Sequence, residues 1–491
     1  MTAAPASSYR PTGAICANPL APYDGPWGPR LAAHLLRRAG FGGSPADVTR
    51  LSSMPMHAAV DSLLQFPNAD ALPALPDLAA PAAQAMSAAR AMSGTPARGD
   101  TAAVRRREMR MQRRAQERAN SLWWLNRMLA TPAPLQEKLT LFLHGHFATA
   151  SGAKGIYGLE IVQQNALLRR YALGNWRELT HSLARDPAML KWLDQARSRK
   201  AQPNENFARE LMELFTLGIG NYTENDVRES ARAFTGFTLA RRNGPFVFNA
   251  AQHDDGEKTF LGHSGNYGGD EVIDIIFAQP AAPRWFARKL LTFFVYTDPE
   301  PELVEATAAL IRKNDFTMRP VIAALLRSNL FYDPRSYRAL VKSPIEFVIG
   351  SYRLFGAAQI EPDALPVLAR MGQMPFHPPS VKGWDGGAQW LNTQTVLARE
   401  NFSSSLTRAP ELASERSWLT AGVPATANEA ATRLVATILQ GDASPASLAR
   451  LQSYLDGSDT SANGKLSPEN SAERIRGAAY LAMAMPAYQL A

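Results

Sequence analysis

The feature that most constrains the fold is a nearly unbroken succession of segments with helical periodicity, from Pro134 toward the end of the chain. Apolar residues recur every three or four positions in segments such as "PLQEKLTLFLHGHF" and "RWFARKLLTFFVY", as on the buried face of an α-helix. One stretch, "GPFVFNAAQHDDGEKTFLG", shows alternation and turn residues instead. We therefore predict a mainly α protein, a large multi-helix orthogonal or bundle-like array with a short β-hairpin insertion near residues 245–262.

The length and apolar content allow a large buried core, because the chain has 491 residues of which 46% are hydrophobic. We predict an irregular N-terminal arm at residues 1–29 and a helical core domain at 30–410. Residues 411–491 are expected to form C-terminal helices packed on the same core. Residues 67–100 are rich in Ala and Pro with little periodicity, which indicates an irregular excursion within the core domain.

Cysteine usage and the N-terminal sequence exclude several classes of protein. The only cysteine, Cys16, permits neither an intrachain disulfide framework nor a thiolate metal cage. The N-terminus lacks a basic start followed by an apolar run, and no apolar stretch approaches the roughly 20 residues that span a bilayer. We therefore expect a soluble, cytoplasmic protein without a membrane span.

The net charge of +8 is concentrated in one segment, "VRRREMRMQRRAQER". Val104, Met111 and Leu122 recur there at helical spacing, which predicts one long helix over residues 101–131. Nucleic-acid grooves usually also need aromatic stacking residues or a recognisable module, and neither is visible here. We interpret the arginines as a solvated face and do not expect a nucleic-acid partner.

The stretch "PNENFARELMELFTLG", residues 203–218, carries many polar side chains on one face of a predicted helix. We select Glu210 and Glu213 as candidate catalytic carboxylates, with Asn204 and Arg209 as candidate substrate-binding residues. The alternative is a solvent-facing helix, because Arg209 has a glutamate four residues before it and another four residues after it, and such pairs stabilise exposed helices. The helix alone does not decide between the two interpretations.

The two histidines of "LFLHGHFAT", His144 and His146, are candidate metal ligands together with Glu210 and His253. In a continuous helix their rings would point about 200° apart and could not share an ion. Gly145 lies between them, so a helix that ends at this glycine would let both rings converge. The alternative is a helix end at which histidine is favoured by the helix dipole.

The segment "AQHDDGEKTFLG" supplies a third group of candidates. His253 and Asp254 could act as a ligand and a general base, and Lys258 could contact an anion or pair with a carboxylate. The alternative is an ordinary turn in which aspartate bonds the backbone.

The loop "FHPPSVKGWDGGAQWLN" combines paired prolines, three glycines and two tryptophans. Such a loop has a fixed shape, and aromatic faces beside Asp and Asn suit sugars. We therefore select Trp384, Asp385 and Trp390 as candidate substrate-binding residues. The alternative is that the tryptophans fill the core.

Several of these segments in this order, among them "HLLRRAGFG", "PNENFARELMELFTLGIGNYTENDV", "KSPIEF" and "PPSVKGWDGGAQWLN", resemble the bacterial family called domain of unknown function 1800. The resemblance spans roughly residues 30 to 410. It implies a large helical bacterial protein, often exported and often encoded beside a phosphatase- or sulfatase-like partner. It carries no established activity, and this chain departs from the exported pattern because no signal is recognised.

These observations lead to two functional hypotheses. The first is a metal-dependent enzyme, a hydrolase or an oxidoreductase, with a His/Glu pocket between central helices that the 375–392 loop closes over a small-molecule or glycan substrate. The metal would be zinc, manganese or iron, and in a hydrolase it would activate water with a glutamate as general base. The second is a non-catalytic binding or assembly protein that recognises a glycan or a protein partner.

Overall fold

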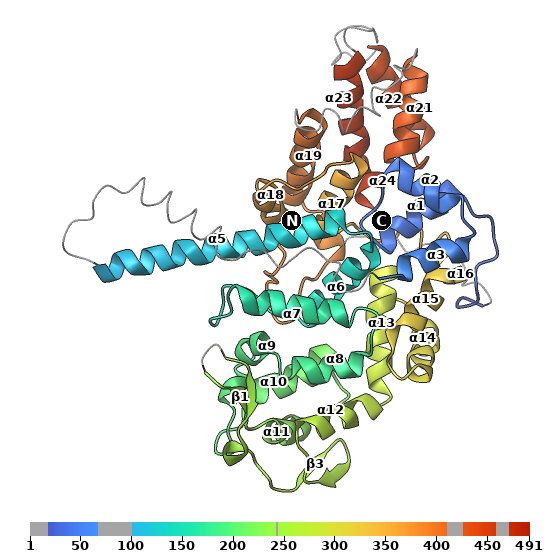
Figure 1. The fold of residues 1–491 in the computed structure, drawn as a ribbon. Helices are drawn as coiled ribbons and strands as arrows, with labels where there is room; N and C mark the ends of the chain where they lie inside the picture. Colours follow the sequence, from blue (N-terminus) through green and yellow to red (C-terminus); the bar gives the residue numbers. More distant parts are fainter. Residues whose placement is uncertain (1–17, 67–100, 242–243, 410–425, 458–470) are drawn as a thin grey trace, which may run out of the picture.

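The computed structural model describes residues 18–66, 101–241, 244–409, 426–457 and 471–491. This part of the chain is mainly helical and contains two small antiparallel ribbons (Figure 1), which confirms the predicted fold class. The predicted excursion at 67–100, Cys16 and most of the N-terminal arm lie outside the described residues. None of the described helices is long and apolar enough to cross a membrane.

The elements of the first half of the chain run from the N-terminal helices to the ribbons. Their bounds are α1 Pro29–Arg38, α2 Pro45–Ser52, α3 Met56–Leu64, α5 Thr101–Ala130, α6 Pro134–His146, α7 Leu159–Arg170, α8 Trp176–Leu183, α9 Pro187–Trp192, α10 Glu205–Glu210, α11 Glu224–Ala233, β1 Phe237–Leu239, β2 Phe246–Phe248, β3 Lys258–Phe260 and β4 His263–Gly265. A π-helical segment, Leu211–Thr216, continues α10 directly.

The second half is helical wherever it is described. Its helices are α12 Gly269–Ala278, α13 Ala281–Phe294, α14 Pro301–Lys313, α15 Met318–Arg327, α16 Asn329–Tyr332, α17 Pro344–Leu354, α18 Ala364–Met371, α19 Thr393–Arg408, α21 Ala427–Ile438, α22 Pro445–Asp456, α23 Ser471–Ala484 and α24 Pro486–Gln489. A 3₁₀ turn, Gly387–Trp390, lies in the loop between α18 and α19.

The β insertion consists of two ribbons between α11 and α12. β1 pairs with β2 in the register Thr238 opposite Val247, and β3 pairs with β4 in the register Thr259 opposite Ser264. Short strands bounded by Gly and Asn suit this part of the sequence, where the helical period is lost. The insertion lies at the lower end of the molecule in Figure 1, beside α11.

The buried apolar residues form two clusters. The first joins α1–α3 with the helices from α6 to α16. The second joins the end of α5 with α17–α19 and the C-terminal helices α21–α24. Helix α6 contributes Phe142 to the first cluster and Leu141 to the second, and every one of its residues except Gly145 is buried. It is therefore the central helix between the two cores.

Two charged residues of α6 are fully buried and paired. Glu137 accepts hydrogen bonds from Arg127 Nε at 2.8 Å, Arg169 Nε at 2.5 Å and Trp124 Nε1 at 2.9 Å. Lys138 forms an ion pair with Glu346 of α17. A buried charge costs free energy unless it is paired, so these contacts fix α5, α7 and α17 against α6.

Helix α5 confirms the predicted long helix. Figure 1 shows that its first half extends away from the body of the protein. Arg105, Arg110 and Arg113 are exposed there, whereas Trp124 and Leu125 near the other end are fully buried. Burial is thus confined to the end that reaches the second core.

Candidate functional site

A cavity of about 290 Å³ lies between α6, α13 and the segment that connects α18 to α19. We call it the central cavity. Its walls combine aromatic, cationic and acidic side chains, and the residues that the argument uses are Arg38, His146, Lys289, Glu346, Lys382, Trp384, Asp385 and Trp390. The three candidate residues of the tryptophan loop therefore line one cavity, and His146 lines it with them.

The tryptophan loop approaches α6 through backbone contact. A Cβ atom on Gly383 would lie 2.1 Å from the carbonyl oxygen of Gly145, and the φ of Gly383 is +83°. Both facts require glycine at position 383, because any side chain would collide with the helix and strain the backbone. The contact brings Trp384 beside the helix, with its ring centroid 5.7 Å from that of His144. Trp384 and Trp390 remain half-buried, so they line a cavity and do not fill the core.

His146 is fixed by a hydrogen bond from its Nε2 to the carbonyl oxygen of Phe215, at 2.8 Å. Because a carbonyl only accepts, Nε2 carries the proton and Nδ1 holds the free lone pair. Nδ1 is buried without a partner. Burial, with a smaller effect from nearby Lys289, lowers the pKa of His146 to about 3. The imidazole is therefore neutral near pH 7.

The Phe215 carbonyl is available because the helix that follows Asn204 changes to a π-helix. In the segment Leu211–Thr216 the backbone widens, and Leu217 N donates to Met212 O, five residues earlier. The last carbonyls of this segment accept from side chains, Leu214 from Trp285 Nε1 and Phe215 from His146. π-Helical turns are frequent at functional sites. The stretch 203–218 thus contacts a residue of the cavity wall, His146, through a backbone carbonyl oxygen, and none of its own residues lines the central cavity.

The hypothesis that His144 and His146 share a metal is wrong in its geometric premise. Helix α6 continues through Gly145 and ends at His146, so the rings diverge as they do in any helix at this spacing. His144 packs edge-on against Trp124 and Phe376. Burial, with a smaller effect from His377, lowers the pKa of His144 to about 3.

The polar face of α10 and of the π-helical segment that follows it is half-buried at the protein surface, and we call Asn204, Arg209, Glu210 and Glu213 the polar strip. Arg209 binds Glu224 through two nitrogens, at 2.6 and 2.8 Å. Glu213 accepts a hydrogen bond from the hydroxyl of Tyr222 at 2.9 Å. Burial and the neighbouring Glu213 raise the pKa of Glu210.

Asn204 completes the polar strip as the N-cap of α10. Its side-chain oxygen accepts from Asn206 N at 2.9 Å, and its amide nitrogen donates to Leu193 O at 3.1 Å. The cap satisfies one of the free N–H groups of the helix start. Asn204 and Arg209 therefore have partners within the protein, and the strip does not line the central cavity.

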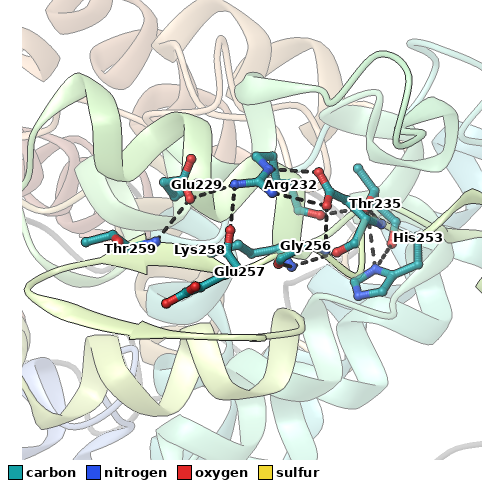
Figure 2. Close-up of polar contacts among 9 residues, drawn as sticks. Glu229, Arg232, Thr235, His253, Gly256, Glu257, Lys258 and Thr259 are labelled. Carbon is teal, nitrogen blue, oxygen red and sulfur yellow. Dashed lines mark hydrogen bonds and ion pairs between the residues drawn. The ribbon is translucent and has the colours of Figure 1, made fainter.

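The turn that carries His253, Asp254 and Lys258 is held against α11 by Arg232, which donates to the side chain of Asp254 and to the carbonyl oxygen of Glu257 (Figure 2). Arg232 Nε donates to Asp254 at 2.8 Å, and its Nη1 donates to Glu229 at 2.8 Å. His253 Nδ1 donates to Thr235 O at 2.8 Å. The arginine contacts lower the pKa of Asp254 to about 2.

Lys258 is 1% exposed, and its Nζ donates to the carbonyl oxygens of Asp254 and Gly256, at 2.6 and 2.9 Å. These contacts satisfy a buried ammonium without a carboxylate. His253 and Asp254 thus stabilise a turn, as in the alternative interpretation of this segment. Lys258 Nζ is bound by backbone carbonyl oxygens.

The predicted metal ligands His144, His146, Glu210 and His253 are not brought together. Within the described ranges, no group of three or more His, Cys, Asp or Glu side chains is arranged to hold a metal ion. The physical reason is that the residues belong to three different surroundings: His144 and His146 diverge on α6, Glu210 lies on the polar strip, and His253 bonds the turn before β1. The residues present do not fit the predicted His/Glu metal group.

The charges of the central cavity are unevenly paired. Glu346 is bound by Lys138, and Asp385 is bound by Lys382 at 2.5 Å. Arg38 donates a hydrogen bond from Nη2 to the carbonyl oxygen of Ser336, while its Nε and Nη1 are buried without a partner. Lys289 contacts the Trp285 ring, with Nζ 4.7 Å from the centroid.

Arg38, Lys289 and Glu346 were not among the residues selected from the sequence. Each lies in an apolar helical segment, "HLLRRAG", "RWFARKLLTFF" and "SPIEFVIG", where a charged residue among apolar ones is the only available signal. A helical projection places such a residue on a buried or an exposed face, but it does not show which distant segments meet there.

These features define a large, mainly helical protein with a cavity walled by a tryptophan-bearing loop, by the buried Arg38 and by the half-buried Lys289. The chain belongs to the family described as "Protein of unknown function (DUF1800)", whose model matches residues 34–490. The resemblance inferred from the motifs is therefore confirmed, and the match continues through the C-terminal helices. Comparison with curated proteins and with solved structures gives no match.

Proposed function

We propose that this protein binds a sugar, or a similar small molecule with flat apolar faces, in the central cavity. The observation that carries the proposal is the pair of half-buried tryptophans, Trp384 and Trp390, on a loop that Gly383 seats against α6. Aromatic rings offer flat apolar surfaces whose edges and faces differ in charge. A ligand pocket usually joins such surfaces to a few polar groups.

The size and lining of the cavity suit a small ligand. A volume of about 290 Å³ is near the lower end of the range of small-molecule sites, which begins at roughly 300 Å³. Glu346 and Asp385 are paired with Lys138 and Lys382, but a carboxylate has further lone pairs that can accept from a hydroxyl group, and Lys289 supplies a donor. Hydroxyl groups need both kinds of partner when they are buried.

A glycan microarray that carries neutral and acidic oligosaccharides tests the proposal directly. We expect the full chain to capture a defined subset of glycans. Trp384→Ala should lose these signals, and Trp384→Phe should keep most of them because it retains a flat ring. Circular dichroism and thermal unfolding of each variant show whether the fold is intact. Absence of capture by the wild type, or equal capture by folded Trp384→Ala, overturns the proposal.

A second candidate is a metal-dependent enzyme, a hydrolase or an oxidoreductase, acting in the same cavity. One observation favours chemistry there: His146 lines the cavity and its Nδ1 is buried without a partner, and histidine is a common general base and metal ligand. The predicted ligands are not gathered, so we derive no catalytic step.

Elemental analysis separates the second candidate from the first. The protein is purified without a metal-affinity column, and His146→Gln, checked by circular dichroism, is compared with the wild type. Near-stoichiometric metal that is lost in the folded variant supports a metal-dependent enzyme. No metal in either sample removes metal dependence from the candidate functions.

A further inference from the structure

We propose that the central cavity receives a negatively charged group of its ligand, a carboxylate, sulfate or phosphate, at the wall formed by Arg38 and Lys289. The inference rests on the proposed function and specifies the chemical class of its ligand. Three observations support it. The protein has a cavity, residues of the cavity wall have donors without a partner, and the acidic residues that could neutralise these donors are paired with other groups.

Arg38 is the first of these donors. It is the last residue of α1 and is 1% exposed. Its Nε and Nη1 are buried without a partner, and the one hydrogen bond of its side chain goes to the Ser336 carbonyl. An unsatisfied buried donor costs about 1 to 3 kcal/mol, and more when the group is charged. A bound anion would accept a charge-assisted hydrogen bond from one of these nitrogens, because Nε and Nη1 point in different directions on the guanidinium plane.

Lys289 is the second donor. It projects from α13 into the same cavity, and among the described residues its contact is the Trp285 ring, not a carboxylate. Burial, and a smaller repulsion from Lys382, lower the pKa of Lys289. A cation that is held near another cation and away from water gains stability when an anion enters.

The acidic residues of the cavity are already engaged. Glu346 pairs with Lys138, and its second oxygen accepts from Ser343 N at 2.6 Å as part of a helix cap. Asp385 pairs with Lys382 on the loop. Arg38 is also attracted by Glu346, but that carboxylate is the ion-pair partner of Lys138, so one negative charge serves two cations. In the part of the chain that the structure describes, Arg38 and Lys289 are therefore the cavity cations that have no carboxylate of their own. A neutral ligand would leave both charges unmatched.

The test measures binding of a matched pair of sugars by isothermal titration calorimetry with the full chain. Methyl glucuronide and methyl glucoside differ in one carboxylate, and inorganic sulfate and phosphate serve as separate probes of the anion alone. The variant is Lys289→Gln. The matched control is Arg288→Gln. Arg288 is exposed on the same helix and lies outside the cavity lining, and its substitution by Gln removes the same charge as Lys289→Gln.

We expect methyl glucuronide to bind roughly tenfold or more tightly than methyl glucoside, the effect of one charge-assisted hydrogen bond. Lys289→Gln should remove that preference and Arg288→Gln should keep it. Arg38→Lys, which retains the charge but loses the Nε and Nη1 donors of the guanidinium, should weaken the preference if it folds. Inorganic sulfate or phosphate binding that exceeds the carboxylate effect and depends on Lys289 would identify a sulfated or phosphorylated ligand.

The outcomes distinguish this inference from the proposed function. Equal binding of both sugars, unchanged in Lys289→Gln, overturns the anion site and leaves the sugar site standing. Sulfate or phosphate binding that depends on Lys289, with no sugar bound and no effect of Trp384→Ala, supports the anion site and overturns the sugar proposal. Equal losses in Lys289→Gln and Arg288→Gln indicate a general charge effect and overturn the assignment to the cavity.

Discussion

The polar strip on α10 and the central cavity differ in how their charges are satisfied. The strip has more charged residues close together in the sequence. However, Arg209 is paired with Glu224, and Glu213 accepts a hydrogen bond from Tyr222. The cavity has few charges, spread over distant segments, and two of them lack a carboxylate partner. A dense cluster of polar residues thus indicates where a protein meets water, whereas an unmatched buried charge indicates where it can receive a ligand.

The largest expected difference is in the free energy of unfolding when a glutamate is replaced by glutamine in each of the two regions. Glu346→Gln leaves Lys138, which is 1% exposed, as a buried ammonium without its ion pair, and should lower the free energy of unfolding by about 3 to 5 kcal/mol. Glu205→Gln removes an exposed pair with Arg209, whose atoms are 3.4 Å apart, and should cost less than about 1 kcal/mol. Urea denaturation measures both. Similar losses would mean that the two regions do not differ as described.

A second comparison uses two glycines with the same backbone conformation. Gly383 and Gly220 have φ of +83° and +89°, but a Cβ meets Gly145 O at the first and nothing within 4 Å at the second. Gly220→Ala should therefore cost only the strain of a left-handed residue, about 1 to 2 kcal/mol. Gly383→Ala should cost that strain and also displace the tryptophan loop from α6.

Thermal unfolding and tryptophan fluorescence measure these two effects separately. We expect a changed emission spectrum and weakened glycan capture for Gly383→Ala, and neither for Gly220→Ala. Unchanged fluorescence and capture in Gly383→Ala would show that the loop does not depend on its contact with α6.

The smallest effect is expected at the turn between the two ribbons and concerns pH. Arg232 holds the pKa of Asp254 at about 2, below its usual value of 3.8. The folded carboxylate thus binds protons less readily than the unfolded one, so its stabilisation is fully present above about pH 4 and is lost as the pH falls toward 2. Wild type should exceed Asp254→Asn in stability by roughly 1 kcal/mol at pH 6.

The difference between wild type and Asp254→Asn should shrink progressively between pH 4 and pH 2, as measured by urea denaturation at each pH. A difference that does not change with pH in this range would contradict the assigned ion pair. Glycan capture should be the same for both proteins at pH 6, because Asp254 does not line the central cavity.

Much of the fold could be predicted because helical periodicity reports burial locally. The long helix α5 and the mainly helical architecture both follow from residues at most a few turns apart. The capping boxes that begin α2 and α11 also depend on neighbours three residues apart. The small β insertion was predicted in this part of the chain because alternation replaces the helical period there, but it consists of two ribbons over residues 237–265 and not of one hairpin near 245–262.

The candidate site could be predicted only in part. The tryptophan loop is visible because its glycines and aromatics are adjacent in the sequence, and Trp384, Asp385 and Trp390 do line a cavity. The metal hypothesis required α6 to end at Gly145, but the helix continues to His146 because its backbone hydrogen bonds are retained. Arg38 and Lys289 line the same cavity because of tertiary packing, and the periodicity of a sequence does not report which distant segments pack together.

The most direct test of the central claim compares one variant of each region on the same glycan microarray. The cavity variant is Trp384→Ala with Lys289→Gln, and the strip variant is Glu210→Gln with Glu213→Gln, which changes two charged side chains outside the cavity. We predict that wild type and the folded strip variant capture the same acidic glycans and that the folded cavity variant captures none of them. Capture that survives in the cavity variant and is lost in the strip variant would contradict the account.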